Sequence, residues 1–177
     1  ALGKIKKKEM TVSYKWTADE LITGQKYHSR HQCRLIFRLL LNLLFLTFII
    51  LSLYLMVYYE FRMSILLVGL MGVYFLILRP YIIRHNYRRQ FTKRPDQDID
   101  IEWIISSENL RSNSILGAGE FVWGAIRKVV ISPEGILMYM NDQMFNWLPQ
   151  KGFSSASDYD SFADLARQHG VPVINVV

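Results

Sequence analysis

Two long stretches of the chain are almost wholly apolar, Leu39–Tyr58 and Met63–Ile83, and only Tyr59–Arg62 separates them. An α-helix rises about 1.5 Å per residue and the apolar core of a bilayer is about 30 Å thick, so a helix of about 20 residues can cross it. A pair of buried helices in a soluble domain is the alternative, but a chain of 177 residues rarely encloses two helices that are apolar on every face. The short connection therefore predicts an antiparallel transmembrane helical hairpin.

The segment before the first apolar stretch has the pattern of a strand followed by a helix. Met10–Trp16 alternates apolar and polar residues, which is the period of a half-buried strand. Thr17 and Glu20 have the spacing of a capping box, in which the Thr hydroxyl accepts a backbone N–H and the Glu carboxylate reaches back. We expect a helix from Ala18 that runs into the first span and projects from the bilayer as a stalk.

The segment after the second apolar stretch predicts a small antiparallel sheet and one helix. A basic helical exit, Ile83–Arg94, ends before Pro95. Alternation and turn residues then predict a meander. Its strands are expected at Asp98–Ile105, Glu108–Ser114, Lys128–Ser132, Ile136–Met140 and Met144–Leu148, with turns at Ile115–Glu120 and Ser132–Gly135. The terminal helix is expected to be capped by Ser157–Asp160, to bury Phe162, Leu165 and Ala166, and to end at Gly170.

These elements predict an α+β membrane protein made of three parts. Residues 1–17 supply a strand that joins the cytoplasmic domain. Residues 18–94 form the stalk and the hairpin, with spans at about 39–58 and 63–83, and residues 95–177 form the cytoplasmic domain. The hairpin is then an insertion between the first and second strands of one folded domain.

Charge is divided unevenly along the chain, and the division changes what the formal net charge of +6 means. Residues 1–94 hold 16 Lys/Arg and 4 Asp/Glu, whereas residues 95–177 hold 5 Lys/Arg and 11 Asp/Glu. The positive charge therefore flanks the apolar stretches, which argues against a nucleic-acid partner. By the positive-inside rule both termini are expected in the cytoplasm. The single cysteine, Cys33, agrees with a reducing compartment.

Two groups of residues are candidates for contacts of the hairpin. Basic side chains after the second span are expected to meet anionic lipid headgroups, each worth about 1 kcal/mol. They are Arg79, Arg84, Arg88, Arg89, Lys93 and Arg94. Packing between the two helices is expected at Asn42, through a hydrogen bond, and at Gly69 and Gly72, where small residues allow close approach.

The search for chemistry finds no catalytic, cofactor or metal site. His28, His31 and Cys33 are close in sequence, but zinc needs three or four ligands in tetrahedral geometry and a helix points His28 and Cys33 to different faces. We expect these residues to lie in a polar stalk. Asp96, Asp98, Asp100 and Glu102 alternate, which predicts a solvent-facing acidic row that could meet the basic exit helix or a basic partner. The protein is expected not to be an enzyme.

Four short stretches together resemble the YcxB-like family of bacterial membrane proteins. They are Trp123–Val130, Gly135–Tyr139, Leu148–Phe153 and the helix around Phe162. The resemblance implies a domain similar to bacterial pleckstrin-homology folds and implies no reaction. The domain core is expected to include the following aromatic residues: Trp103, Trp123, Tyr139, Trp147, Phe153 and Phe162.

The expected function is protein–protein recognition at the membrane, by an accessory, assembly or regulatory component of a membrane complex. An immunity protein that neutralises a toxin at the cytoplasmic membrane is the first alternative, because an acidic domain suits charge complementarity. An anionic-lipid-sensing module is the second. A channel or transporter subunit would require a homo-oligomer, since two spans cannot enclose a pathway alone.

Overall fold

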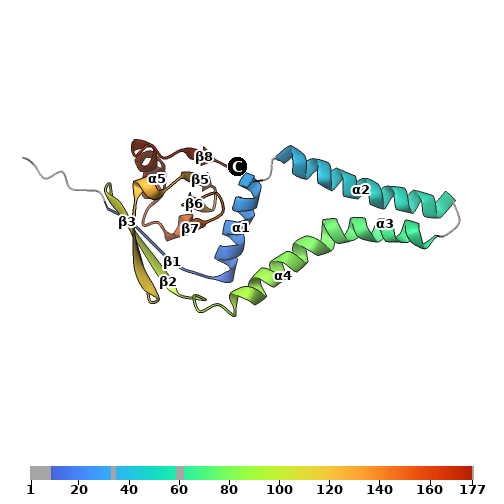
Figure 1. Cartoon of the computed structure of the whole chain (residues 1–177), viewed down its shortest axis with the longest axis horizontal. Helices are drawn as coiled ribbons and strands as arrows, with labels where there is room; N and C mark the ends of the chain where they lie inside the picture. Colours follow the sequence, from blue (N-terminus) through green and yellow to red (C-terminus); the bar gives the residue numbers. More distant parts are fainter. Residues whose placement is uncertain (1–8, 33–34, 59–61, 177) are drawn as a thin grey trace, which may run out of the picture. The chain divides into compact units, whose positions relative to one another are not determined.

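The computed structural model describes residues 9–32, 35–58 and 62–176, and these fall into two compact units. One unit is Gln32–Gln90 and the other combines Ala1–His31 with Phe91–Val177. The two units differ in secondary structure (Figure 1). The first consists of apolar helices, whereas the second is built on two β-sheets. The prediction of an α+β chain with two long apolar helices and antiparallel strand pairing is confirmed.

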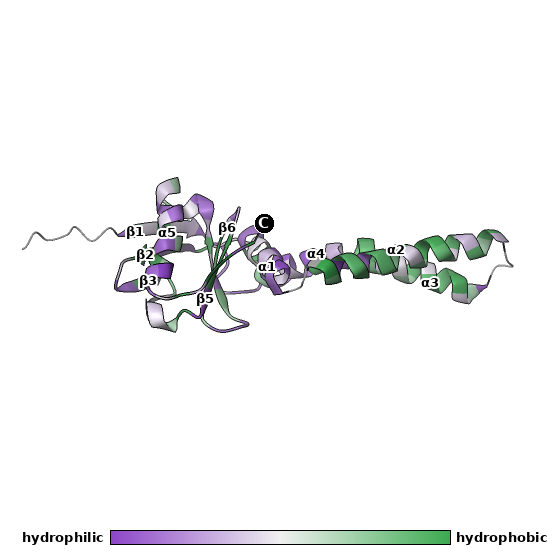
Figure 2. Ribbon diagram, turned by 90° about the horizontal axis from the view of Figure 1, so that it is seen from above, coloured by the Kyte–Doolittle hydropathy of each residue, from purple (hydrophilic) through white to green (hydrophobic). Residues whose placement is uncertain are grey.

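The helical unit consists of α2, Leu35–Tyr58, and a second long helix made of α3, η1 and α4. α3 covers Met63–Val73, η1 is a π-helical turn at Tyr74–Leu78, and α4 covers Arg79–Phe91. Both helices, over Ile36–Tyr58 and Met63–Phe91, are long and apolar enough to cross a membrane. Figure 2 shows hydrophobic colour along α2 and α3.

The π-helical turn has a cause in the sequence. Pro80 lies in the first turn of α4, directly after η1. A proline inside a helix has no backbone N–H to donate to the carbonyl four residues earlier, and its ring clashes with that carbonyl. A π-helical turn widens the backbone at that point and absorbs the clash.

Sheet A has four strands in the order β1-β2-β3-β4, all antiparallel. They are β1, Met10–Lys15; β2, Asp100–Ile105; β3, Asn109–Ser114; and β4, Gly117–Val122. β1 pairs with β2 from Met10 opposite Ile105 to Lys15 opposite Asp100, so a strand before both long helices is the neighbour of a strand after them.

Sheet B has the order β7-β6-β5-β8, where β5 is Lys128–Ser132, β6 is Gly135–Tyr139, β7 is Phe145–Pro149 and β8 is Val173–Asn175. β5, β6 and β7 are antiparallel, and β8 pairs parallel to β5 after α5, Ala156–Gln168, has crossed over. Short 3₁₀ turns, η2 at Trp123–Ala125 and η3 at Gln150–Gly152, connect these elements. The expectation of a single small sheet is therefore wrong, because the meander divides between two sheets.

The main core lies where the inner face of sheet A meets one face of sheet B and α5. It includes Val12, Trp103 and Leu110 from sheet A, Ile136 and Leu148 from sheet B, and Phe162 from α5. A second cluster lies on the opposite face of sheet B, where Val130, Leu137, Tyr139 and Trp147 pack against Tyr27 of α1, Ala18–Gln32. Sheet B is thus covered on both faces.

The position of α1 differs from the expected stalk. α1 packs on sheet B, and the buried residues of its contacting face are Glu20, Gly24 and Tyr27. This face has no apolar stripe, so the sequence pattern gave no sign that the helix is docked. Residues 33–34, where α1 was expected to continue into the first span, lie outside the described residues, as does the connection at 59–61.

Both ends of α5 have the capping residues expected from the sequence, although the N-cap lies at a different position. The N-cap of α5 is Ser155, whose hydroxyl accepts the Asp158 backbone N–H at 3.1 Å, two residues before the expected cap. The helix ends at Gln168, and Gly170, two residues later, has a φ of +72°, a left-handed conformation that glycine adopts without strain.

Candidate recognition surface

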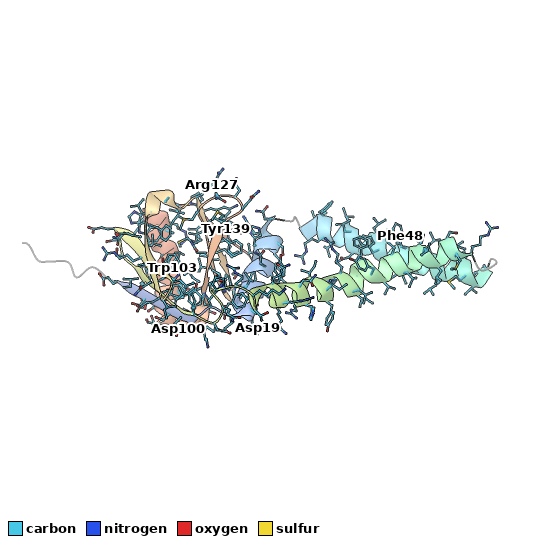
Figure 3. The ribbon with its side chains drawn as sticks, turned by 60° about the horizontal axis from the view of Figure 1, so that its bottom comes forward. Asp19, Phe48, Asp100, Trp103, Arg127 and Tyr139 are labelled. Atoms are coloured by element: carbon cyan, nitrogen blue, oxygen red, sulfur yellow. The ribbon has the colours of Figure 1, made fainter. Side chains whose placement is uncertain are left out.

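The outer face of sheet A is open to solvent. Alternation along β1 and β2 directs Ser13, Lys15, Asp100 and Glu102 outward, and all four are exposed. Figure 3 labels Asp100 and Trp103, which β2 carries on opposite faces, the first exposed and the second buried. On β3 and β4 the exposed outward positions are Arg111, Asn113, Ala118, Glu120 and Val122.

A shallow hollow of about 590 Å³ lies at one end of this sheet. The Asp100 and Glu102 carboxylates, the Lys15 ammonium and the Asn113 amide are among its lining groups. These are mixed polar groups without a convergent catalytic set, and among the described residues no group of His, Cys, Asp and Glu could hold a metal ion. The hollow is suited to polar contacts with a macromolecule.

The expected acidic row is only partly on this face. Asp100 and Glu102 lie on β2, but the strand begins at Asp100, and Asp96 and Asp98 lie in the turn before it. Asp98 has a φ of +54° there, and Asp96 accepts two hydrogen bonds from the Arg94 guanidinium at 2.8 and 2.7 Å. A turn conformation therefore replaces the first half of the predicted row.

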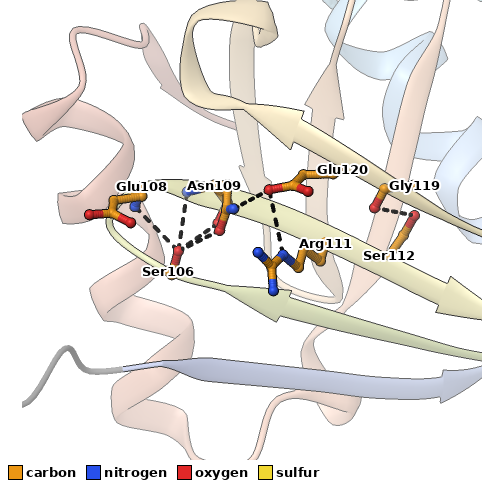
Figure 4. A network of polar contacts seen from close by, with 7 residues as sticks. All are labelled: Ser106, Glu108, Asn109, Arg111, Ser112, Gly119 and Glu120. Atoms are coloured by element: carbon orange, nitrogen blue, oxygen red, sulfur yellow. Dashed lines mark hydrogen bonds and ion pairs between the residues drawn. The ribbon is translucent and has the colours of Figure 1, made fainter.

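A polar network fixes the β3–β4 hairpin at its open end (Figure 4). The Asn109 side-chain amide donates to the Glu120 carboxylate, which also lies 3.5 Å from Arg111 Nε. The Ser106 hydroxyl donates to Asn109 Oδ1 at 2.8 Å and accepts the backbone N–H groups of Glu108 and Asn109 at 3.2 and 3.1 Å. These contacts hold the two strands in one register.

The closed end of the same hairpin is apolar and exposed. Ile115 and Leu116 form its two-residue turn and are 85% and 58% exposed, and Val122 at the other end of β4 is 60% exposed. β4 is the last strand of sheet A, so one of its edges has no neighbouring strand in the part of the chain that the structure describes. An unpaired strand edge flanked by exposed apolar residues is typical of an interaction surface.

The contact between α1 and sheet B is charged and aromatic. Glu20, 6% exposed, accepts a hydrogen bond from Trp147 Nε1 at 2.7 Å and lies 2.5 Å from Lys151 Nζ. Tyr27 stacks on Trp147 with ring centroids 6.1 Å apart and donates to Glu134 at 2.8 Å. Glu20 was expected to complete a capping box, and its carboxylate binds the sheet instead.

Hydrogen bonding sets the ionisation of Glu134 at this contact. The Lys26 ammonium donates to the Glu134 carboxylate at 2.8 Å and the Tyr27 hydroxyl donates to the same oxygen. Both bonds favour the charged form, so they lower the pKa of Glu134 below its usual value.

His28 and His31 lie against sheet B rather than in a free stalk. His28 Nδ1 is 2.8 Å from the Tyr139 hydroxyl, and its ring stacks on Phe145 with centroids 4.9 Å apart. Burial and the nearby Lys128 ammonium lower the pKa of both histidines. Burial also raises the pKa of Tyr139 to about 12. Cys33, the third member of the sequence cluster, lies outside the described residues.

The aromatic residues expected in the core are all buried: Trp103, Trp123, Tyr139, Trp147, Phe153 and Phe162. Two of them also anchor polar groups. Trp123 Nε1 donates to Ser106 O at 3.0 Å, and Trp147 binds Glu20 as above. These side chains form the scaffold behind the surface and are not part of it.

In the helical unit, Gly69 and Gly72 lie against α2. A Cβ on Gly69 would be 2.6 Å from the Ser52 hydroxyl, and one on Gly72 would be 2.8 Å from the Phe45 carbonyl oxygen. Ser52 donates to Ile65 O at 2.7 Å, whereas Asn42 is exposed on α2. The polar contact between these helices is thus made by a serine that the sequence pattern did not single out.

The basic residues expected at lipid headgroups are exposed: Arg79, Arg84, Arg88, Arg89, Lys93 and Arg94. The Arg79 guanidinium also lies over the Phe75 ring, 5.5 Å from its centroid. Arg94 makes the ion pair with Asp96 described above. The hypothesis of lipid contact remains a prediction.

Comparison with known proteins gives one match. The family model described as YcxB-like protein matches residues 105–166, which run from the last residue of β2 into α5 and include β3 to β7. No curated protein and no solved structure matches the chain. Over residues 105–166 the chain therefore carries a YcxB-like segment, as the motifs around Trp123, Tyr139 and Phe153 indicated.

Proposed function

We propose that this is a non-enzymatic bacterial inner-membrane protein that binds another protein through the outer face of sheet A. α2 and the α3–α4 helix would cross the membrane, with both termini in the cytoplasm. Their length and apolar composition support the crossing. The excess of Lys and Arg before the first helix and after the second supports the orientation.

The sheet unit is the recognition domain of this proposal, with a fold similar to bacterial pleckstrin-homology domains. The observation that carries it is the contrast between a bare sheet A and a sheet B covered on both faces. A bare, polar face with a hollow beside exposed carboxylates favours a macromolecular partner with polar and basic groups.

The partner we favour is a subunit of a membrane complex that this protein stabilises, helps to assemble or regulates. An immunity protein that neutralises a toxin is the alternative from another class. The acidic balance of residues 95–177 supports that alternative, because complementary charge speeds association with a basic toxin. The identity of a captured partner discriminates between the two.

Anionic-lipid sensing is a second candidate, favoured by the exposed arginines on α4. Arg84 and Arg88 are four residues apart and therefore lie on one side of the helix. In contrast, the described part of residues 95–177 holds few basic groups for a headgroup site on the domain itself. Protein binding therefore remains the preferred function.

Site-specific photocrosslinking in native membranes tests the proposal. A photoreactive residue at Asn113, beside the hollow, is expected to capture a defined protein. The same group at Gln168, exposed on α5 rather than on the outer face of sheet A, is the matched control. Glu102→Lys in the Asn113 variant is expected to abolish capture, since it reverses a charge at the hollow.

The outcomes separate the candidate functions. Capture at Asn113 that depends on Glu102 supports recognition through sheet A, and equal capture at Gln168 contradicts it. If no protein is captured and the purified full-length chain binds anionic lipid in vesicles of mixed composition, the lipid hypothesis is favoured instead. Loss of that binding in an Arg84→Ala, Arg88→Ala variant would then locate the contact.

A further inference from the structure

Four strands form the outer edges of the two sheets, and only β4 has an unprotected edge among the described residues. β1 forms a bridge from Val12 to Phe153, and its Thr11 carbonyl accepts the Ser154 hydroxyl at 3.2 Å. β7 ends at Pro149 and β8 is three residues long. No backbone hydrogen bond of the described residues joins β4 to a segment other than β3. Natural sheets usually protect such an edge.

The small residues at the start of β4 leave its free edge accessible. Gly117, Ala118 and Gly119 have little or no side chain to obstruct an approaching strand. The loop between β3 and β4 has two residues, so the backbone groups of Gly117, Gly119 and Phe121 point toward β3. Those of Ala118, Glu120 and Val122 then point outward, where a further strand can bind them.

We propose that two copies of this chain associate by antiparallel pairing of their β4 strands, centred on Gly119. In this register Gly119 lies opposite the Gly119 of the second copy, where antiparallel strands approach most closely. Ala118 lies opposite Glu120, and their outward N–H and C=O groups exchange hydrogen bonds. Sheet A becomes continuous across the two copies.

The same register pairs exposed apolar side chains and places a large residue opposite a small one. Phe121, which packs on the core of its own copy, lies opposite Gly117, so the two do not compete for space. Leu116, 58% exposed, lies opposite Val122, 60% exposed, so each copy covers an exposed apolar residue of the other. Cross-strand pairs of this kind are the unit of sheet stabilisation.

Neighbouring registers are less favourable. Pairing centred on Glu120 would place two Glu120 carboxylates opposite each other, and like charges in that position are destabilising. Pairing centred on Ala118 would place Leu116 opposite Glu120. If the two β4 strands were shifted by one residue, even-numbered residues of one copy would lie opposite odd-numbered residues of the other. The paired side chains would then point to opposite faces of the sheet. The centre at Gly119 pairs Leu116 with Val122 and Phe121 with Gly117, and it places no like charges opposite each other.

This association does not depend on the proposed recognition function, because it uses the edge of sheet A rather than its face. Cysteine pairing tests the register in the full-length protein in mild detergent, in a Cys33→Ser background. One preparation carries Ala118→Cys and a second, with a different tag, carries Glu120→Cys. Facing Cα atoms about 5.5 Å apart suit a disulfide.

The mixed preparation is expected to form the two-tag disulfide about tenfold more than either preparation forms its own, because only Ala118 and Glu120 face each other. Equal crosslinking in the separate preparations, or none in the mixture, overturns the register. Leu116→Cys mixed with Val122→Cys is a second pair that must behave alike.

Light scattering on the wild-type chain and two variants tests the association itself. Val122→Glu is expected to weaken the dimer by about tenfold or more, since it buries a charge opposite Leu116. Ala118→Pro removes an outward N–H that β3 does not use. Met144→Glu, at a residue 65% exposed in another loop, is the matched control and should leave the dimer unchanged. A monomeric wild type, or a dimer that persists in both edge variants, overturns the proposal.

Discussion

The two sheets of the folded unit differ in how their faces are covered, although their strands are similar in length. Every residue of β6 in sheet B, from Gly135 to Tyr139, is buried, because the main core covers one face and α1 covers the other. In sheet A most outward positions of β2, β3 and β4 are exposed, and Ile104 and Asn109 are half-buried. The comparison separates a scaffold from a surface that is free to interact, and it predicts where substitutions cost stability.

The largest effect is expected at Trp147, which lies at the contact between sheet B and α1. Its indole stacks on Tyr27, donates to Glu20 and lies 2.7 Å from where a Cβ on Gly135 would be. Trp147→Ala is expected to lower the free energy of unfolding by about 3–5 kcal/mol, through lost burial and a cavity. Chemical denaturation in detergent measures this. A loss below about 1 kcal/mol would show that α1 and sheet B are not a tightly packed pair.

Gly24 provides the next test, because α1 approaches sheet B most closely there. A Cβ on Gly24 would be 3.3 Å from both Phe145 Cε2 and Trp147 Cγ. Gly24→Leu is therefore expected to cost about 1–3 kcal/mol by overpacking and to lower hydrogen-exchange protection of α1 amides. Ser29→Leu, on the exposed side of α1, is the control and should leave that protection unchanged.

Glu20 tests the polar part of the same contact. Glu20→Ala leaves the buried Trp147 N–H without its acceptor, so we expect a loss of about 1–3 kcal/mol. Lys151→Ala removes only the exposed partner of Glu20 and should cost less than about 1 kcal/mol. Equal losses in the two variants would contradict the assignment of the main role to the buried hydrogen bond.

A smaller effect is expected from pH. The pKa of His28 and that of His31 are lower in the folded state than the ordinary value of 6.5, so protonation favours the unfolded state. Stability is complete above about pH 6.5 and falls as the pH drops below it. The lowered pKa of Glu134 adds a loss in the same direction below its ordinary 4.5. In a His28→Gln, His31→Gln variant, thermal melts should lose the first step and keep the second.

The smallest effect on stability is expected at the bare face of sheet A. Glu102→Lys lies at an exposed outward position and should change the free energy of unfolding by less than about 0.5 kcal/mol. Under the proposed function the same change abolishes partner capture. A loss of stability comparable to that of Trp147→Ala would remove the distinction between the two sheets.

Much of the fold could be predicted because patterns of neighbouring residues determine many of its elements. Alternation in Met10–Trp16 and Asp98–Ile105 indicated β1 and β2, and the two apolar stretches indicated the long helices. The hairpin at Ser132–Gly135 and the end of α5 just before Gly170 followed from turn chemistry. In each case neighbouring residues along the chain supply the physical cause.

Other elements depend on tertiary contacts that local patterns do not record. The sequence predicts a turn at Ile115–Glu120 because Gly117, Ala118 and Gly119 carry no visible alternation, yet pairing with β3 makes β4 a strand. β8 is three residues long and pairs in parallel with β5, so its partner lies across α5. α1 packs on sheet B through Glu20, Gly24 and Tyr27. Their spacing places them on one face of the helix, but they do not form the apolar stripe by which a buried helix face is recognised in a sequence.

The pairing of β1 with β2 also imposes an order on biosynthesis. Met10–Lys15 leaves the ribosome first, but its partner Asp100–Ile105 follows only after both long helices have been translated. During that interval β1 has no ladder partner and sheet A cannot close. If the helices enter a membrane as proposed, the insertion machinery receives them from a nascent chain whose domain is still open, so delivery to the lipid precedes folding of the domain.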